Sequence, residues 1–216
     1  MPGQGIRAVI FDKDGVLIDT EGEYDRRRRA FFAENNIDDS AFPDFYGSNN
    51  AVIWSCVEPD DPARREELYQ AFLARFSDEP LRYSRFLVPG VADTLRALKG
   101  RGLLLGLASS SPHWCIDNFL VECGLADIFD VVLSGEEVAA SKPAPDVYLA
   151  VMEALGVEPS RVLVVEDSPI GLRAAHDSGA RVCSILPPSA PALDQSLADV
   201  HVDRFGDVLK LVQRPI

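Results

Sequence analysis

The sequence predicts an α/β protein built on a parallel sheet, and three observations support this prediction. Short, nearly continuous apolar runs recur along the chain, segments of helical period separate them, and glycines or prolines stand at the boundaries. Continuous apolar runs are typical of strands that are covered on both faces. Strands that alternate with helices are typical of a parallel sheet with right-handed crossover connections.

The expected elements follow one another in regular order. Strands are expected at residues 6–11, 103–108, 131–134, 161–166 and 181–185. Helices are expected between them, at residues 91–99, 112–123, 145–155 and 170–178. Glycines such as Gly124 and Gly156 follow the helices as stop signals. Pro112 and Pro145 stand at helix starts, where a missing N–H group is tolerated.

One long stretch interrupts this alternation. Residues 18–83 contain no convincing buried strand, but they have helical patterns at 24–34 and 63–76. A helical insertion directly after the first strand is expected to form a small cap, with hinge strands at 19–20 and 86–89. We therefore expect a Rossmann-like core formed by residues 1–17 and 84–216, with an inserted α-helical cap domain at residues 18–83.

Composition narrows the possible partners and the compartment. The 216 residues include 21 basic and 34 acidic side chains, which gives a formal net charge of −13. Such a charge repels phosphate backbones and anionic lipids, so we expect no nucleic-acid and no membrane partner. The four cysteines lack CxxC spacing, and no window approaches the roughly 18 apolar residues of a membrane span. We expect a reduced, cytoplasmic protein that is monomeric by default.

Polar residues gather where the expected strands end. Ligands in open α/β sheets bind beyond the carboxyl ends of the strands, so these residues should meet at one rim. They comprise four carboxylates, one lysine and a serine cluster: Asp12, Asp14, Ser109, Ser110, Ser111, Lys142, Glu166 and Asp167.

The chemistry of this set is restrictive. Four carboxylates repel one another unless a cation neutralises them, and oxygen ligands with open positions suit Mg²⁺. A phosphate dianion could enter only beside that metal, with Lys142 and donors such as Ser109. One carboxylate could then attack phosphorus, and a second acid two residues on could protonate the leaving alkoxide and later deprotonate water.

Four motifs carry a resemblance to a known family. Residues 11–20, 107–111, 138–146 and 165–171 resemble, in order, the motifs of the haloacid dehalogenase-like hydrolase superfamily. The similarity runs from residue 6 to about residue 180. It points to the β-phosphoglucomutase/phosphatase branch, whose members have a small helical cap.

The resemblance implies a role for each motif residue. Asp12 would be the nucleophile that forms an aspartyl-phosphate, and Asp14 the general acid and base. Ser109 and Lys142 would bind and neutralise the transferring phosphoryl group, and Ser110 joins them as an expected substrate-binding residue. The Mg²⁺ ligands would be Asp12, the backbone carbonyl of Asp14, Glu166 and Asp167, with Glu166 acting directly or through water.

The expected function is Mg²⁺-dependent hydrolysis of a small phosphate monoester, such as a sugar phosphate. Asp14 argues against dehalogenation, because dehalogenases of the superfamily lack this second acid. A phosphosugar mutase resembling β-phosphoglucomutase is an alternative, but residues 21–25 contain no histidine and the loop 46–50 offers asparagines where a mutase needs an arginine. The other alternative is a non-catalytic phosphate-binding or regulatory module, against which the complete motifs weigh.

Four further features carry weaker predictions. Lys13 occupies a position where an apolar residue is common in the family, and it could add positive charge near the mouth of the site. Ser111 is expected to cap the helix that begins at Pro112. Ser168 either caps a helix or supports the site. The arginines at 26–29 are expected to form a solvated face, paired with Glu21, Glu23 and Glu34.

Overall fold

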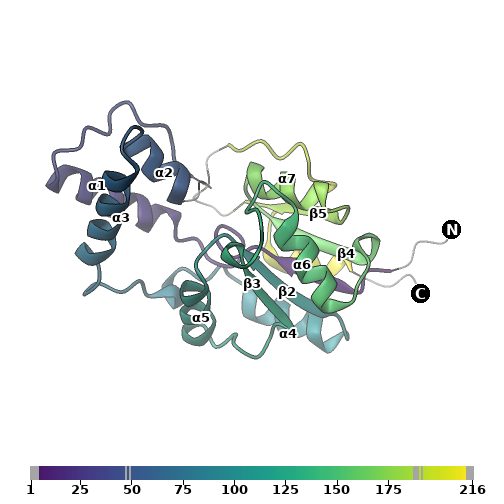
Figure 1. Cartoon of the computed structure of the whole chain (residues 1–216). Helices are drawn as coiled ribbons and strands as arrows, with labels where there is room; N and C mark the ends of the chain where they lie inside the picture. The colour runs from purple at the N-terminus through teal and green to yellow at the C-terminus, as the bar shows by residue number, and fades with distance from the viewer. Residues whose placement is uncertain (1–4, 47, 49, 187–189, 191, 213–216) are drawn as a thin grey trace. The chain divides into compact units, whose positions relative to one another are not determined.

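The computed structural model describes residues 5–46, 48, 50–186, 190 and 192–212 (Figure 1). The chain divides into two compact units. One, which we call the core, consists of Met1–Asp19 and Tyr83–Ile216; the other, the helical insertion, consists of Thr20–Arg82. Gly47 and Asn49 of the loop that bears on the mutase alternative lie outside the described residues.

Six parallel strands form the sheet of the core within the described residues. Their order is β3-β2-β1-β4-β5-β6, and every neighbouring pair is parallel. The strands are β1 (Ala8–Phe11), β2 (Leu104–Ser109), β3 (Val131–Ser134), β4 (Val162–Glu166), β5 (Arg181–Ile185) and β6 (Val200–Val202). The chain order reverses beside β1, and the crevice at such a reversal is where open α/β sheets bind ligands. The predicted α/β class with a parallel sheet is confirmed.

Helices cover both faces of this sheet (Figure 1). The core helices are α4 (Val91–Gly100), α5 (His113–Glu122), α6 (Asp146–Leu155), α7 (Pro169–Asp177) and α8 (Val208–Leu211). Ala8 and Ile10 pack in one apolar cluster with residues of α6 and α7, such as Val151. On the opposite face Phe11 stacks on Phe205, with ring centroids 5.4 Å apart. Burial on both faces explains why β1 reads as a continuous apolar run.

The two connections between the units pair with each other inside the core. Ile18 and Leu87 form an antiparallel bridge, and the N–H of Asp19 donates to the carbonyl of Phe86 at 2.8 Å. The expected hinge strands at 19–20 and 86–89 are therefore shorter than expected. The pairing joins Ile18 with Leu87 and Asp19 with Phe86. Thr20 is instead the residue that precedes α1.

The helical insertion consists of three helices, within its described residues, around an aromatic cluster. These are α1 (Glu21–Glu34), α2 (Asn50–Val57) and α3 (Pro62–Arg75). At its centre Phe31 meets Trp54 and Phe72 edge to face, and the rings of Trp54 and Phe72 are tilted against each other, with ring centroids 5.4–6.0 Å apart. Asp61 begins α3 by accepting hydrogen bonds from the N–H groups of Ala63 and Arg64.

The arginine run in α1 differs from the expected solvated face. Arg26 and Arg29 are exposed, but Arg27 and Arg28 are buried. Glu23 pairs with Arg26 and Arg27, and Glu21 pairs with Arg28, as expected. Glu34, however, pairs with Arg75 of α3 at 2.8 Å instead of with the run. The prediction was wrong for Arg27 and Arg28, because a 14-residue helix packed in a small bundle turns part of a four-residue run inward.

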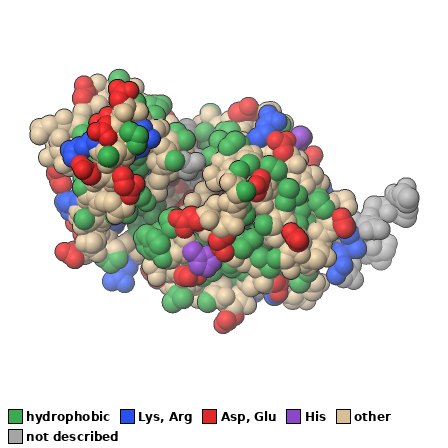
Figure 2. Space-filling view, viewed as in Figure 1, with side chains coloured by type: hydrophobic (Ala, Val, Ile, Leu, Met, Phe, Trp, Pro, Cys, Tyr) green, Lys and Arg blue, Asp and Glu red, His purple; other side chains and the backbone are tan. Residues whose placement is uncertain are grey.

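The molecular surface carries mixed charge. Figure 2 shows acidic side chains spread over the visible face of both units, with basic side chains between them. Among the described residues, no helix combines the length and the apolar character that crossing a membrane requires.

Candidate active site

Neighbouring strands β1 and β4 end side by side and bring three carboxylates together. Asp12 directly follows β1, and its N–H donates to the carbonyl of Val165 in β4 at 3.0 Å. Glu166 is the last residue of β4, and Asp167 follows it. Asp12, Glu166 and Asp167 each offer a carboxylate oxygen, and these three atoms lie within 4.8 Å of one another. All three residues are buried.

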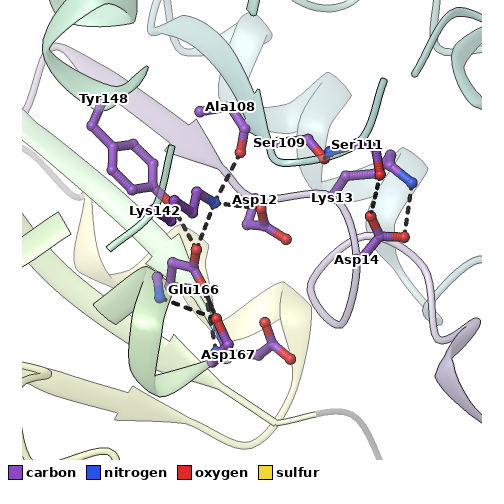
Figure 3. Close-up of polar contacts among 12 residues, drawn as sticks. Asp12, Lys13, Asp14, Ala108, Ser109, Ser111, Lys142, Tyr148, Glu166 and Asp167 are labelled. Atoms are coloured by element: carbon purple, nitrogen blue, oxygen red, sulfur yellow. Dashed lines mark hydrogen bonds and ion pairs between the residues drawn. The ribbon is translucent and has the colours of Figure 1, made fainter. Parts of the chain in front are cut away.

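Lys142 supplies the positive charge of this cluster (Figure 3). Its Nζ donates to Asp12 Oδ1 at 2.5 Å, to Glu166 Oε1 at 2.7 Å and to the carbonyl of Ala108 at 3.2 Å. The side chain is only 3% exposed. Buried charges are stable only when they are paired, so this lysine and its two carboxylates depend on one another.

Glu166 is held at both oxygens by groups of the protein. Oε1 accepts from Lys142 and from the hydroxyl of Tyr148, each at 2.7 Å. Oε2 accepts from the N–H of Asp167 at 2.9 Å and from the N–H and hydroxyl of Ser168. Ser168 also accepts from the N–H of Gly171, so it both supports the site and caps α7.

Tyr148 is the residue that sequence reasoning missed. It lies in α6, fully buried, with the Lys142 ammonium 4.8 Å from the centre of its ring. A ring face attracts a cation, so Tyr148 stabilises the lysine and hydrogen-bonds its partner carboxylate. The sequence offers only a weak signal, a tyrosine in a helix that starts just after the Lys142 motif.

The electrostatics of the cluster are dominated by burial. Burial raises the pKa of Asp12 to about 7; the charge of Lys142 opposes this shift and the charge of Glu166 adds to it. Burial and the neighbouring Glu166 also raise the pKa of Asp167 well above its ordinary value. Burial acts on Glu166 in the same direction, but the charge of Lys142 and the hydrogen bonds from Lys142, Tyr148 and Ser168 together outweigh it and lower the pKa of that carboxyl. One ammonium is thus too little positive charge for three buried carboxylates.

Two glycines make room for the carboxylates. A Cβ atom on Gly15, whose φ is +83°, would lie 1.9 Å from Asp167 Oδ2, and one on Gly171 would lie 1.8 Å from Glu166 Oε1. Neither distance is sterically possible, so both positions require glycine. Both glycines lie within the motifs found in the sequence, where they could have signalled this close approach.

Asp14 points away from the carboxylate cluster. Figure 3 shows Asp14 grouped with Lys13 and Ser111, apart from Asp12, Glu166 and Asp167. Asp14 Oδ1 accepts from Lys13 Nζ at 2.7 Å, and Asp14 Oδ2 accepts from the hydroxyl of Ser111 at 2.8 Å. Lys13, expected near the mouth, is 1% exposed.

The prediction that Ser111 caps α5 was wrong. The residue that precedes this helix is Pro112, and no side chain caps it. The hydroxyl of Ser111 donates to Asp14 instead, because the turn after β2 directs it toward the first loop.

Ser109 and Ser110 occupy different environments at the end of β2. Ser109 is buried, and its hydroxyl oxygen accepts from the N–H of Ser111 at 3.1 Å. Ser110 is exposed. The carbonyl of Ala108, directly before Ser109, contacts Lys142, so the end of β2 borders the cluster.

The residues present fit a divalent cation. Three buried carboxylates with oxygens within 4.8 Å of one another form a set of hard ligands, and their surplus negative charge is what a bound cation would neutralise. The arrangement therefore combines three buried carboxylates that fit a cation with a buried ammonium at one sheet edge.

Comparison with known proteins agrees with this geometry. The model of the haloacid dehalogenase-like hydrolase family matches residues 6–179. The chain belongs to this family. It is 36% identical over 212 residues to hexitol phosphatase B of Escherichia coli K12, covering 94% of each chain. It is 34% identical to the phosphorylated carbohydrates phosphatase of Thermotoga maritima, covering 81% of this chain and 82% of that protein.

A solved structure extends the similarity to three dimensions. The crystal structure of CbbY from Rhodobacter sphaeroides in complex with phosphate superimposes with a TM-score of 0.76 at 26% identity, covering 94% of this chain and 96% of that one. The family, the fold with its inserted helical cap and the enzyme class predicted from the sequence, a phosphoric monoester hydrolase, are confirmed.

Proposed function

We propose that this protein is a Mg²⁺-dependent phosphatase that hydrolyses the monophosphate of a small sugar or sugar alcohol through an aspartyl-phosphate on Asp12. The observation that carries the proposal is the buried group of Asp12, Lys142, Glu166 and Asp167. Such a group gives a nucleophile, a counter-charge and cation ligands without a further cofactor.

The substrate class is proposed from the relatives. The names of two of them specify hexitol phosphates and phosphorylated carbohydrates. A neutral polyol carrying one phosphate also suits a chain with net charge −13, because it brings little negative charge beyond the phosphate. We assign the cap, predicted as residues 18–83, as the part of the chain that selects among such substrates.

Mg²⁺ would be held by Asp12, the backbone carbonyl of Asp14, Glu166 and Asp167. It would supply a positive charge that neutralises the carboxylates and polarises the phosphoryl oxygens. The two Glu166 oxygens already accept five hydrogen bonds from the protein. We therefore infer that Glu166 acts mainly by fixing Lys142 and contacts the ion through water.

The first half of the reaction transfers the phosphoryl group to the protein. A carboxylate oxygen of Asp12 forms a bond to phosphorus while the bond from phosphorus to the ester oxygen breaks. Asp14 gives its proton to that oxygen, which leaves as an alcohol. Lys142 neutralises the phosphoryl group, and the serines at the end of β2, Ser109 and Ser110, donate hydrogen bonds to it.

The second half returns the protein to its starting state. Asp14, now a carboxylate, accepts a proton from a water molecule, and the water oxygen bonds to phosphorus. The bond between phosphorus and Asp12 breaks, which releases inorganic phosphate and leaves Asp14 protonated again.

The setting of the reaction is proposed from the cysteines. Cys56, Cys115, Cys123 and Cys183 are all thiols without a disulfide. Reduced cysteines fit a cytoplasmic protein, which is the location that we propose. Separately, we propose that the protein is a monomer whose partners are small molecules only.

The direct test is release of phosphate from sorbitol 6-phosphate with Mg²⁺ and with EDTA. We expect turnover that EDTA abolishes, and loss of about 10³-fold or more in Asp12→Asn because the nucleophile is removed. Asp93→Asn, the same change at a 94% exposed side chain, is the matched control and should retain full activity. Activity in EDTA, or an active Asp12→Asn variant, would contradict the proposal.

The same assay separates the two alternatives. A mutase given β-glucose 1-phosphate and a trace of its bisphosphate would produce glucose 6-phosphate, whereas we expect only free phosphate. A binding module would release no phosphate from any monoester in a panel of sugar, polyol and glycolate phosphates.

A further inference from the structure

The buried lysine of the first loop has no part in the cation site described above. Lys13 is 1% exposed, although lysine is one of the residues that are almost never fully buried without a partner. Its ammonium lies over the aromatic rings of Tyr83 and Phe119, 5.8 and 5.9 Å from their centres. An ammonium held in this way is costly to bury, so its partner matters.

That partner is Asp14. The ammonium donates to Asp14 Oδ1 at 2.7 Å, while the hydroxyl of Ser111 donates to Asp14 Oδ2 at 2.8 Å (Figure 3). One donor comes from the loop after β1 and the other from the loop after β2. The carboxylate is thus fixed from two sides, although its side chain is 39% exposed.

The backbone beneath this contact is also fixed. The carbonyl of Lys13 accepts from the N–H groups of Leu17 and Ile18, and the N–H of Gly15 donates to the carbonyl of Ile18 at 2.8 Å. These hydrogen bonds fix the backbone position from which the Lys13 side chain extends. A buried ammonium on a fixed backbone, with two aromatic rings nearby, directs its neighbour more strongly than a lysine free in solvent would.

We propose that Lys13 is a positioning residue for Asp14: together with Ser111 it holds in one orientation the carboxylate form of Asp14, the form that this side chain takes as its proton passes to the leaving group. This inference rests on the proposed function, because it assumes that Asp14 protonates the departing oxygen. Lys13 would act on Asp14 alone: its ammonium is paired with that carboxylate and is not offered to a phosphate.

The leaving group distinguishes this role from a structural one. When the bond to the ester oxygen breaks, an alkyl alcohol leaves only if a proton reaches that oxygen, whereas p-nitrophenolate leaves with little help. General acid catalysis is worth about 10²–10⁴-fold, and a misdirected acid loses part of it. Loss of Lys13 should therefore slow an alkyl phosphate much more than an aryl phosphate.

The experiment compares kcat/KM of Lys13→Met on sorbitol 6-phosphate and on p-nitrophenyl phosphate. This parameter covers the steps up to departure of the alcohol and leaves out the later hydrolysis of the phosphoenzyme. We expect a fall of about tenfold or more on sorbitol 6-phosphate, a fall of less than about threefold on p-nitrophenyl phosphate, and KM values within about twofold of the wild type. Equal losses on both substrates, or none, would overturn the proposal.

Two further variants complete the test. Asp14→Asn should show the same preference for the aryl phosphate, and adding Lys13→Met to it should cause no further loss, because Lys13 acts through Asp14. An additional loss of more than about threefold would overturn the proposal. If Asp14→Asn itself slows both substrates equally, the assignment of Asp14 as general acid fails, and with it the role of Lys13; if only Lys13→Met lacks the preference, the proposed function stands without this inference.

The folding of the variants is controlled separately. Ser111→Ala removes the second donor without creating a buried gap, and we expect the same preference with a loss of about threefold. It decides the proposal if Lys13→Met does not fold, and no preference in Ser111→Ala would then overturn it. Lys99→Met breaks another lysine–aspartate pair of the core, with Asp130 at 2.7 Å, and should leave both kcat/KM values unchanged.

Discussion

The core and the helical insertion bury different kinds of side chain. The core buries charge: Asp12, Lys13, Lys142, Glu166 and Asp167 are each at most 7% exposed, and all lie where strands end or in the segments that follow. The insertion buries mainly rings, including Phe31, Trp54 and Phe72, and apart from those of Arg27 and Arg28 its ion pairs lie at partly or fully exposed positions.

The two kinds of buried side chain affect the stability of the fold differently. Burial of rings stabilises a fold without further conditions, whereas buried charge lowers stability unless each group is paired. The cluster of Asp12, Glu166 and Asp167 has one ammonium, that of Lys142, against three carboxylates, an imbalance that a well-packed apolar edge would avoid. Natural proteins keep such features where function requires them. The contrast can be tested by changing one region at a time.

The largest effect is expected from Lys142→Met. Removal of this charge leaves Asp12 and Glu166 buried without their counter-ion, which should lower the free energy of unfolding by about 3 kcal/mol. Phosphatase activity should fall by about 10²-fold or more. Urea unfolding in EDTA measures the first effect, with Lys99→Met, a half-exposed pair expected to cost less than about 1 kcal/mol, as the control. Similar decreases in the free energy of unfolding of the two variants would show that the buried ion pairs contribute no more to stability than the partly exposed one.

A comparable loss of stability is expected from Phe72→Ala in the insertion, but confined to that unit. Phe72 contacts the rings of Phe31, Trp54 and Phe76, so its truncation should cost about 3 kcal/mol. Hydrogen exchange should rise in peptides from residues 20–82, while β1 and β4 stay protected. Val52→Ala, a 48% exposed apolar residue, should change little. Equal loss of protection in both units would contradict their separate stability.

A pair of glycine substitutions sharpens the comparison further. Gly171→Ala places a methyl group within 1.8 Å of Glu166 Oε1 and should lower stability by about 2 kcal/mol, together with activity. Gly22→Ala in α1 meets no atom within 4 Å and should raise stability by about 0.5 kcal/mol, because the unfolded chain loses freedom. Thermal unfolding measures both. The contrast fails if the two melting temperatures move in the same direction.

The smallest effect concerns acid. Hydrogen bonds from Arg26 and Arg27 lower the pKa of Glu23 to about 2. Since the folded pKa lies below the ordinary value of 4.5, the pair stabilises the insertion above about pH 4.5 and loses this effect as the pH falls toward 2. Glu23→Gln should thus cost about 0.5–1 kcal/mol at pH 6, and this cost should shrink as the pH falls from about 4.5 toward 2. Glu153→Gln, on the exposed side of α6, should show no such trend. A cost independent of pH would remove the ion pair as its cause.

Much of the sheet and the meeting of its strand ends could be predicted, because both follow from local patterns. β3 and β5 have the predicted bounds, and Asp12, Lys142, Glu166 and Asp167 come together since neighbouring parallel strands end at one edge. The strand β6 and the helix α2 were missed. The three residues of β6 are partly exposed and form no apolar run, and α2 is apolar without a clear polar face.

The side-chain directions could not be predicted. Asp12 and Asp14 are two residues apart, yet only Asp12 joins the cluster, because the turn formed by Lys13, Gly15 and Ile18 directs Asp14 elsewhere. Tyr148 reaches Glu166 across eighteen positions of sequence, a contact that depends on how α6 packs on the sheet. The spacing of residues in the sequence determines neither the direction of the Asp14 side chain nor the contact between Tyr148 and Glu166.

The hydrogen bond from Asp19 to Phe86 means that the insertion leaves and re-enters the core through adjacent residues. Because the entropy cost of bringing two chain ends together rises only slowly with the length of the loop, so long an insertion adds little to the cost of folding the sheet. None of the six strands lies within residues 20–82. An unrelated segment whose own termini lie close together could be inserted at these two residues without removing a strand from the sheet, so this junction is a natural place to exchange the helical insertion for another unit.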